Sequence, residues 1–215
     1  MIVNYLNKVF ALFAKYNFEI YLAGGSARDF LLNKDFKDFD FATPITSNQL
    51  IESLNITDYD SFAIKFGTLK CHLFENDVEI TTFRKEGEYK DFRRPSSISF
   101  VSSIEEDSKR RDFTINAIYI DKGYKIYDFH DGVNDLNNKI IRMIGDPYIR
   151  LKEDPVRILR ALRFKTNLNF EIDPYLMEAM KKNKIYLQKI SKDRLNLELN
   201  KFKHLKYYNE FMSDN

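Results

Sequence analysis

The chain has 215 residues, 44% of them hydrophobic and 31% charged, and this composition excludes an intrinsically disordered protein. Its one cysteine, Cys71, excludes an internal disulfide and a cysteine-based zinc site. The net charge of +2 does not by itself indicate a nucleic-acid partner.

Basic and acidic residues are unevenly distributed along the chain. Residues 1–138 carry 17 basic and 22 acidic side chains, whereas residues 139–206 carry 17 basic and 8 acidic ones. A basic segment that follows an acidic one is typical of a phosphate-rich partner held beside a carboxylate-bearing site. A lysine-rich solvated surface would give the same distribution, so charge alone leaves both interpretations open.

Helical patterns alternate with strand patterns over the first 83 residues. Apolar spacing predicts a helix over 2–17, whose apolar run is too short to span a membrane, so we expect a cytoplasmic protein. Gly24 and Gly25 are predicted to form a tight turn into a helix over 26–32. A further helix begins at Thr46 or Ser47. Strands are predicted over 19–23, 37–43, 66–74 and 77–83, with Glu75 and Asn76 as a hairpin turn.

The rest of the chain changes from loop to helix. Residues 84–97 are polar and aperiodic, which predicts a mobile loop, and helical turns and a strand over 124–129 follow. Beyond residue 150 the pattern is helical. Helices are predicted to begin at the N-cap pairs Asp154-Pro155 and Asp173-Pro174, and a third at Ser191 to cover 192–203. The sequence therefore predicts an α/β head over about 1–150 and a helical neck over 151–215.

Paired carboxylates mark one candidate site. Asp38 and Asp40 lie two apart in a predicted strand, so their side chains project to one face while Phe39 and Phe41 face the core. Such carboxylates repel each other unless a cation bridges them, and oxygen ligands suit Mg²⁺. Glu79, on a neighbouring predicted strand, is a candidate third carboxylate or a solvent-facing residue. A solvated acidic edge strand is the alternative interpretation.

A phosphate-binding turn lies about a dozen residues upstream of the carboxylates. Gly24 and Gly25 would present backbone N–H groups at the positive end of a helix dipole, which suits a triphosphate. Arg28 adds a fixed positive charge one turn later. Either motif alone is weak, but together they predict a metal-dependent nucleotide site.

The segment RRDFTINAI supplies further polar candidates. Arg110 and Arg111 would hold phosphates or steady the site. Asp112 and Asn116 are four apart on a predicted helical turn and would together bind a ribose hydroxyl. A charged helix start that packs its apolar residues inward is the alternative.

A polar stripe follows the predicted helix at EDPVRILRALRF. Asp154, Arg157, Arg160 and Arg163 recur every three residues. A carboxylate accepts from the exocyclic amine of cytosine or adenine, and a guanidinium donates to the ring acceptor, so Asp154 and Arg157 could admit C and A but not G or U. Arg160 and Arg163 would remain for phosphates. An Asp–Arg capping pair on an amphipathic helix is the alternative.

The chain resembles the class II tRNA nucleotidyltransferases (CCA-adding enzymes) and the related bacterial poly(A) polymerases. The resemblance is carried, in order, by LAGGSARDFLL, DFDFAT, RRDFTINAI, KEDPVRILRALRF and ISKDRLNLELNKF. It implies a polymerase-β-like nucleotidyltransferase head with a small mixed sheet and an all-helical neck. It also implies untemplated addition of C and/or A to the tRNA 3′ end from CTP and ATP, with metal bound by Asp38 and Asp40, where we expect two-metal catalysis by Mg²⁺. The implied nucleotide-binding residues are Gly25, Arg28, Arg111, Asp154, Arg157, Arg160 and Arg163.

The segment TFRKEGEYKDFRRP resembles the flexible loop of relatives that can add the terminal A. Relatives that add only CC lack this segment, and poly(A) polymerases have a different one, so the resemblance favours a CCA-adding or A-adding enzyme. The candidate loop residues are Arg84, Tyr89, Asp91, Arg93 and Arg94.

The chain departs from the family pattern in two places. The stretch 128–132 lacks the Pro and paired Gly expected there, which leaves its hinge behaviour open. Family members usually continue into helical domains that grip the tRNA elbow, whereas this chain stops at Asn215. A truncated piece, a naturally minimal enzyme with a weaker grip, or a chain that needs a partner would each fit.

Other functions are also compatible with the sequence. A poly(A) polymerase would make long A tails from ATP alone, and the basic neck argues against a nucleotidyltransferase that modifies a small molecule or a protein. A non-catalytic RNA- or nucleotide-binding module is the alternative outside the enzymes. His72, His130 and His204 form no metal-ligand pattern in the sequence.

Overall fold

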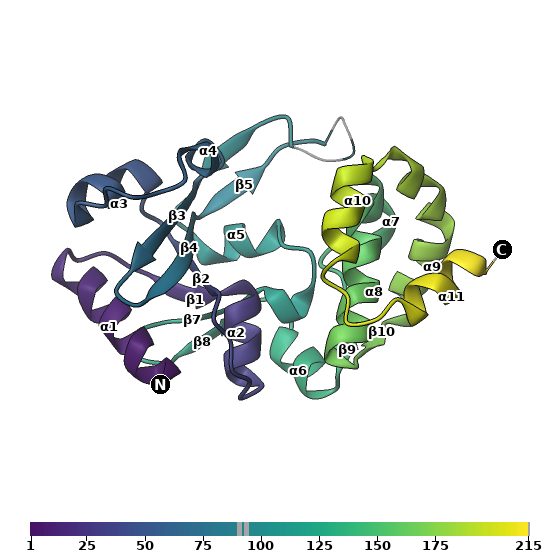
Figure 1. Cartoon of the computed structure of the whole chain (residues 1–215), viewed down its shortest axis with the longest axis horizontal. Helices are drawn as coiled ribbons and strands as arrows, with labels where there is room; N and C mark the ends of the chain where they lie inside the picture. Colours follow the sequence, from purple (N-terminus) through teal and green to yellow (C-terminus); the bar gives the residue numbers. More distant parts are fainter. Residues whose placement is uncertain (90–91, 93–94, 215) are drawn as a thin grey trace. The chain divides into compact units, whose positions relative to one another are not determined.

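The computed structural model describes residues 1–89, Phe92 and 95–214, which form two compact units (Figure 1). The head unit comprises 1–86, 98–111 and 116–132, and the neck unit comprises the described parts of 87–97, 112–115 and 133 onward. The chain passes into most of the neck unit at Gly132–Val133. The predicted division by role at about residue 150 falls within a helix of the neck unit and stays a prediction.

The head unit is built on a six-stranded mixed sheet with the order β3-β4-β2-β1-β7-β8. β2 and β4 pair in parallel, and the other neighbouring strands pair antiparallel. The α/β class and the mixed sheet are therefore as predicted. The strands are β1 (Tyr21–Ala23), β2 (Phe39–Thr43), β3 (Thr68–Leu73), β4 (Asn76–Thr82), β7 (Ile118–Ile120) and β8 (Ile126–Asp128).

The core of the head lies between the first helix and this sheet. Apolar side chains of α1 recur at helical spacing, and they pack in one cluster with Phe39, Phe41, Leu69 and Ile80. Phe39 and Phe41 are 4% and 2% exposed, which leaves Asp40 between them on the other face of β2. The helices are α1 (Ile2–Lys15), α2 (Gly24–Leu31), α3 (Ser47–Leu54), α4 (Ser61–Ile64) and α5 (Ile104–Lys109).

Three local predictions in the head are wrong. The β3–β4 hairpin turns at Phe74 and Glu75, not at Glu75 and Asn76, because Phe74 takes a positive φ of 55° and Asn76 already pairs with Leu73. Part of the predicted loop is a strand, since β5 (Arg84–Glu86) pairs with β6 (Ile98–Phe100). Gly24 is the first residue of α2, not part of a turn before it.

The neck unit is mostly helical. The prediction of an all-helical neck is wrong, because the unit also contains two short strands. β9 (Ile140–Ile141) and β10 (Glu171–Ile172) form a short parallel pair. The Asp–Pro pairs and Ser191 begin helices as expected, because their side-chain oxygens accept from the first-turn N–H groups. The helical segments are α6 (Gly132–Asn137), α7 (Pro147–Glu153), α8 (Val156–Leu168), α9 (Pro174–Asn183), η2 (Lys184–Lys189), α10 (Lys192–Leu199) and α11 (Lys206–Ser213).

Two neck helices differ from expectation. α10 ends at Leu199, short of residue 203, and α11 was not predicted. No helix in the described part of the chain has both the length and the apolar character needed to cross a membrane.

Candidate active site

The start of α2 is where the head brings its predicted site residues together. Gly24 has a φ of +61°, and a Cβ placed on it would lie 3.3 Å from Arg111 Nη1 and 3.4 Å from Asp40 Oδ2. A Cβ on Gly25 would also lie 3.4 Å from Asp40 Oδ2. Glycine is therefore needed here both for the left-handed backbone and for the close approach of two charged side chains.

A serine hydroxyl fixes this helix start against β2. Ser26 Oγ donates to the Asp38 carbonyl at 2.8 Å and accepts from the Asp40 N–H at 2.7 Å. Ser26 is 2% exposed, so both hydrogen bonds are shielded from solvent. The sequence motifs did not indicate this role for Ser26, although its place directly after the glycine pair in a helix-opening segment was the available signal.

Asp40 is a half-buried carboxylate among other charges. Its pKa is raised to about 6, first by burial and then by the nearby carboxylates of Glu79 and Asp38, while Arg111 and the Gly25 N–H act in the opposite direction. Asp38 is exposed and precedes β2, which begins at Phe39. Negative charge therefore concentrates beside the N-terminus of α2, as a site for a cation requires.

Glu79 faces Asp40 across the parallel β2–β4 pair. Its carboxylate forms an ion pair of 2.8 Å with Lys70 on β3. Within the described residues, no three His, Cys, Asp or Glu side chains are grouped as a metal site. Mg²⁺ is usually held by one or two carboxylates together with substrate phosphates and water, and the pair Asp38 and Asp40 matches that number.

Arg28 is anchored beside the same helix start. It donates twice to Asp29, at 2.9 and 2.8 Å, and its Nη1 donates to Asn116 Oδ1 at 2.8 Å. Its Nη2 lies 3.6 Å from a Cβ placed on Gly25. The guanidinium is thus held in a fixed direction at the position where the sequence predicts phosphate binding.

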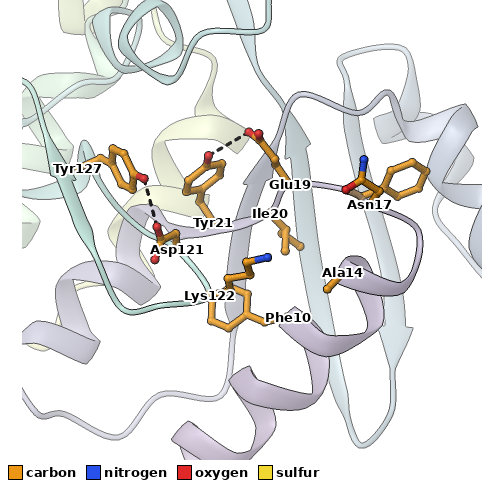
Figure 2. Close-up of a pocket in the computed structure, with 10 residues that line it drawn as sticks. Phe10, Ala14, Asn17, Glu19, Ile20, Tyr21, Asp121, Lys122 and Tyr127 are labelled. Carbon is orange, nitrogen blue, oxygen red and sulfur yellow. Dashed lines mark hydrogen bonds between the residues drawn. The ribbon is translucent and has the colours of Figure 1, made fainter.

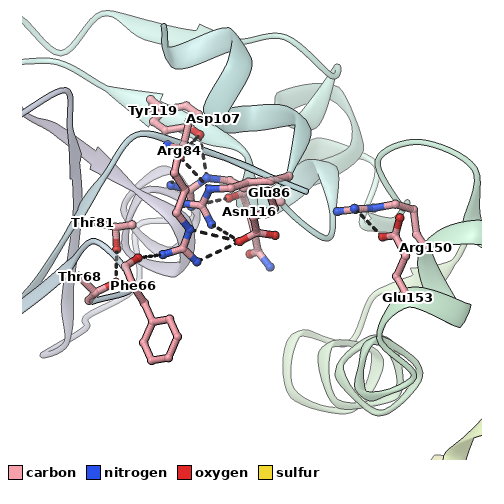
Figure 3. Close-up of polar contacts among 12 residues, drawn as sticks. Phe66, Thr68, Thr81, Arg84, Glu86, Asp107, Asn116, Tyr119, Arg150 and Glu153 are labelled. Atoms are coloured by element: carbon pink, nitrogen blue, oxygen red, sulfur yellow. Dashed lines mark hydrogen bonds and ion pairs between the residues drawn. The ribbon is translucent and has the colours of Figure 1, made fainter. Parts of the chain in front are cut away.

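Arg111 is held by a buried carboxylate, Asp107, that the sequence motifs did not single out. Figure 3 shows Asp107 with its partner Tyr119. Arg111 Nε donates to the Tyr119 hydroxyl at 2.7 Å and its Nη2 to Asp107 at 3.3 Å. Asp107 is fully buried and also accepts from Tyr119 at 2.6 Å and from Arg110 at 2.8 Å. Burial would raise the pKa of Asp107, but Arg110 and Arg111 hold it below its ordinary value.

The predicted loop residues lie in different local structures, and three of them lie outside the described residues. Arg84 lies in β5, where it pairs with Glu86 at 3.0 Å and donates to the Phe66 carbonyl. Tyr89 forms an isolated antiparallel bridge with Pro95. The candidates Asp91, Arg93 and Arg94 lie outside the described residues.

Asp112 and Asn116 do not share a helical turn, which corrects the sequence prediction. The only helical residues of this segment within the described chain are those of a short 3₁₀ turn, η1 (Thr114–Asn116). Asp112 belongs to the neck unit, where its Oδ2 accepts from Arg160 Nε at 2.6 Å. Burial opposes ionisation, but Arg160 lowers the Asp112 pKa to about 2.

The predicted base-reading residues are engaged within the neck unit. Asp154 Oδ1 accepts from the Val156 N–H at 3.1 Å, and its Oδ2 pairs with Arg194 at 2.7 Å. Arg157 donates to the Arg150 carbonyl at 2.6 Å and to Glu153 at 3.0 Å.

The remaining arginines of the stripe are ion-paired as well. Arg160 pairs with Asp112, and Arg163 pairs with Glu198 of α10 at 2.5 Å. The segment that contains Arg194 and Glu198 contributes to the family resemblance, but the sequence indicated no role for these two residues. Their spacing of four residues on one helix was the signal available there.

A separate cavity of about 380 Å³ lies in the head unit (Figure 2). Tyr21 and Tyr127 line it and donate to Glu19 and Asp121, at 3.0 and 3.1 Å. None of the site residues predicted from the sequence lines this cavity.

Comparison with known families decides the membership of the chain. A family model described as the poly A polymerase head domain matches residues 20–142. The chain belongs to this family. A second model, described as the probable RNA and SrmB-binding site of polymerase A, matches residues 169–208. The resemblance drawn from the sequence motifs is thereby confirmed.

Several curated relatives of the chain are named CCA-adding enzymes. The chain is 44% identical over 184 residues to a CCA-adding enzyme of Streptococcus suis, with 86% of this chain and 45% of the relative covered. The chain thus spans less than half the length of that curated relative.

Two solved structures extend this similarity to the fold. The Bacillus stearothermophilus CCA-adding enzyme in complex with CTP aligns with a TM-score of 0.81 at 31% identity, covering 91% of this chain and 47% of that one. A tRNA nucleotidyltransferase complexed with a primer tRNA and an incoming ATP analog aligns with a TM-score of 0.72 at 27% identity, covering 96% and 58%. The nucleotidyltransferase head fold predicted from the sequence is confirmed.

Proposed function

We propose that the protein is a tRNA nucleotidyltransferase that adds C, A or both to the tRNA 3′ end from CTP and ATP. The observation that carries the proposal is the convergence of Asp40, Arg28 and Arg111 on the glycine pair that begins α2. Relatives named CCA-adding enzymes, one of them solved with CTP, support the substrate class.

Basic and acidic groups of the head would have different roles in phosphoryl transfer. The N–H groups at the start of α2, with Arg28 and Arg111, would bind the triphosphate and stabilise the charge on the departing pyrophosphate. Both guanidiniums are held by hydrogen bonds within the head, so little reorganisation is needed when the nucleotide binds.

Asp38 and Asp40 would hold Mg²⁺. When bound there, the ions supply charge neutralisation and activation of the 3′-hydroxyl for in-line attack on the α-phosphorus. The support for this assignment is the raised pKa of Asp40, because it reflects a charge that the protein alone compensates poorly. Glu79 is already paired with Lys70, so it would be a lesser contributor.

Asp154 and Arg157 would select the base, and Arg160 and Arg163 would support the nucleotide from the same helix. Each lies in or next to α8. A carboxylate accepts from the amine of C or A and meets a carbonyl in G or U. Substituting Asp154→Ala should therefore relax the preference for CTP and ATP over GTP and UTP.

The decisive experiment is extension of tRNAs that end before CCA, at CC and at CCA, with labelled CTP and ATP given separately and together. The chain should extend the first two substrates and stop at CCA. Asp40→Ala should reduce extension about a thousandfold, because metal-borne charge stabilisation contributes several kcal/mol. Asp77→Ala, at an exposed carboxylate on the β3–β4 hairpin, is the matched control. Undiminished extension by Asp40→Ala would refute the metal assignment.

Poly(A) synthesis is the second candidate, and the description of the matching head-domain family favours it. ATP alone would then support long A tails on an RNA that already ends in CCA. Binding of nucleotide and tRNA without any extension would instead indicate a non-catalytic module.

A further inference from the structure

Arg194 of α10 forms an ion pair with Asp154, the carboxylate that is proposed to recognise the base. Its Nη2 lies 2.7 Å from Asp154 Oδ2, while the Val156 N–H donates to Asp154 Oδ1 at 3.1 Å. The side chains of Arg194 and Asp154 are 23% and 15% exposed. Both oxygens of the carboxylate are thus fixed, one by the backbone N–H of the first residue of α8 and one by Arg194 of α10.

Arg157, the predicted partner of Asp154 in base reading, does not hold it. Arg157 donates to the Arg150 carbonyl and to Glu153, and its guanidinium carbon lies 5.5 Å from the centre of the Tyr89 ring. Among the described residues, Arg194 is the one cation that is ion-paired with Asp154. The direction of the Asp154 carboxylate therefore depends on α10.

Two ion pairs join α10 to Asp154 and to Arg163 of α8. The buried residue of α10 is Glu198, which pairs with Arg163, and Leu197 is 64% exposed. Arg194 and Glu198 lie four residues apart and so share a helix face. Partly buried ion pairs add little net stability compared with apolar packing, but they fix direction well.

The Asp154 carboxylate can discriminate between bases only if its direction is fixed. Each carboxylate oxygen has two acceptor positions, so Asp154 can accept from an exocyclic amine while it keeps its present hydrogen bonds. Guanine and uracil would place a carbonyl oxygen against the same carboxylate. A carboxylate that could rotate away would relieve this repulsion, and the penalty against the wrong bases would disappear.

We infer that Arg194 is a positioning residue for base selection, which acts by holding Asp154 rigid so that G and U are rejected. The inference rests on the proposed function, because it assumes that Asp154 meets the base. Arg194 itself needs no contact with the nucleotide. Its loss should change which nucleotides are accepted more than how fast the correct ones react.

The test compares all four nucleotides on a tRNA that lacks CCA, with the full chain and its Arg194→Ala and Arg194→Lys variants. The ratio of kcat/KM for CTP over UTP, and for ATP over GTP, should fall about tenfold in Arg194→Ala, the effect of one hydrogen bond to a charged group. Arg194→Lys keeps the charge but not the planar fork, so a smaller fall is expected.

Glu198→Gln is the matched control, since it removes the other ion pair of α10, the one with Arg163 of α8. This variant should destabilise the contact to a similar extent. Because Arg163 is proposed to support the nucleotide, kcat/KM for all four nucleotides can change together, while both ratios stay at their original values. A merely structural role for Arg194 would move thermal stability equally in both variants and leave base choice unchanged.

A double-substitution cycle separates positioning from direct contact. In the Asp154→Ala background, Arg194→Ala should cause no further loss of selectivity. An added loss would mean that Arg194 meets the base itself, and tighter CTP and ATP binding with unchanged ratios would mean that it competes with the base. Either result, or full selectivity in Arg194→Ala, overturns the inference.

Failure of the proposed function gives a different result. If the original chain extends no tRNA, equilibrium binding of the four nucleotides to the same variants still measures the ratios. Equal binding of all four by the original chain would refute the role of Asp154, and with it the inference. Selective binding that persists in Arg194→Ala would refute the inference alone.

Discussion

Buried charged residues decide the geometry of the head. Asp107 is fully buried, yet it accepts hydrogen bonds from Tyr119, Arg110 and Arg111, and so it fixes a guanidinium beside Asp40. A buried carboxylate is tolerated only with such partners, because its unpaired charge would cost several kcal/mol. Sequence reasoning found Arg111 from its motif but not Asp107, since Glu105 and Glu106 beside it look the same in a one-dimensional pattern.

Removing the Tyr119 hydroxyl should therefore weaken the fold. In Tyr119→Phe, Asp107 loses a 2.6 Å hydrogen bond that solvent cannot replace, so we expect the free energy of unfolding to fall by about 1–3 kcal/mol. Urea unfolding followed by circular dichroism measures the change. The control is Tyr127→Phe, whose hydroxyl bonds Asp121 in a more exposed place. An equal effect of the two substitutions would contradict the assigned importance of Asp107.

The Asp112–Arg160 pair should make stability depend on pH in acid. The Asp112 pKa of about 2 lies below the value near 3.9 of an unfolded chain, so the pair stabilises the fold above about pH 4. That contribution, about 2–3 kcal/mol, is lost progressively as the pH falls from about 5 to below 2. Asp112→Asn should therefore lose less stability than the original chain between pH 5 and 2. Unfolding curves across this range give the slope of the free energy of unfolding against pH. The control is Asp77→Asn, at an exposed carboxylate. If the pair contributes nothing, Asp112→Asn will show the same slope as the original chain.

At the scale of elements, the sequence predicted best where capping or periodicity is local. α3 begins at one of its two predicted starts, since Thr46 is its N-cap and forms a capping box with Gln49, and Asp173 caps α9 as its Asp-Pro pair indicated. The short strands β7, β9 and β10 were missed because they have two or three residues and exist only through pairing with distant segments. The place of Asp112 was missed for the same reason, since its partner Arg160 lies 48 residues away.

Gly24 shows how α2 connects backbone geometry with the site. Gly24→Ala would strain a φ of +61° and push a methyl group to within 3.3 Å of Arg111 and 3.4 Å of Asp40. We expect a loss of about 1–2 kcal/mol in stability and about tenfold weaker CTP binding. Gly145→Ala is the matched control, because Gly145 has a φ of +77° but its Cβ would meet only ordinary contacts at 3.7 Å. Calorimetry measures the CTP affinity of both variants, and only Gly24→Ala should bind CTP more weakly. Equal CTP affinity in both variants would contradict the argument from close approach.

For the whole molecule, the decisive feature is how charge is divided along the chain. Residues 139–206 carry 17 basic and 8 acidic side chains, and the family model for a probable RNA-binding site matches 169–208, which lies mostly within this range. The sequence could locate this asymmetry, but it could not show that Arg142, Arg157, Arg160 and Arg163 are ion-paired. Exposed lysines are therefore better candidates than these arginines for the proposed contacts with RNA phosphates.

Lys189 and Lys192 are two exposed lysines of this range, and neutralising them should change how tRNA binding responds to salt. Each lysine that binds a phosphate releases a counterion, so the slope of log affinity against log salt concentration should become shallower by about 0.7–0.9 for each such lysine neutralised. Lys189→Gln with Lys192→Gln should thus weaken tRNA binding most at low salt and leave CTP binding unchanged. The control pair, Lys15→Gln with Lys34→Gln, removes the same charge from exposed positions of the head. Filter binding at several salt concentrations gives both slopes, and equal slopes for the two pairs would show that net charge, rather than contact through the neck, governs tRNA affinity.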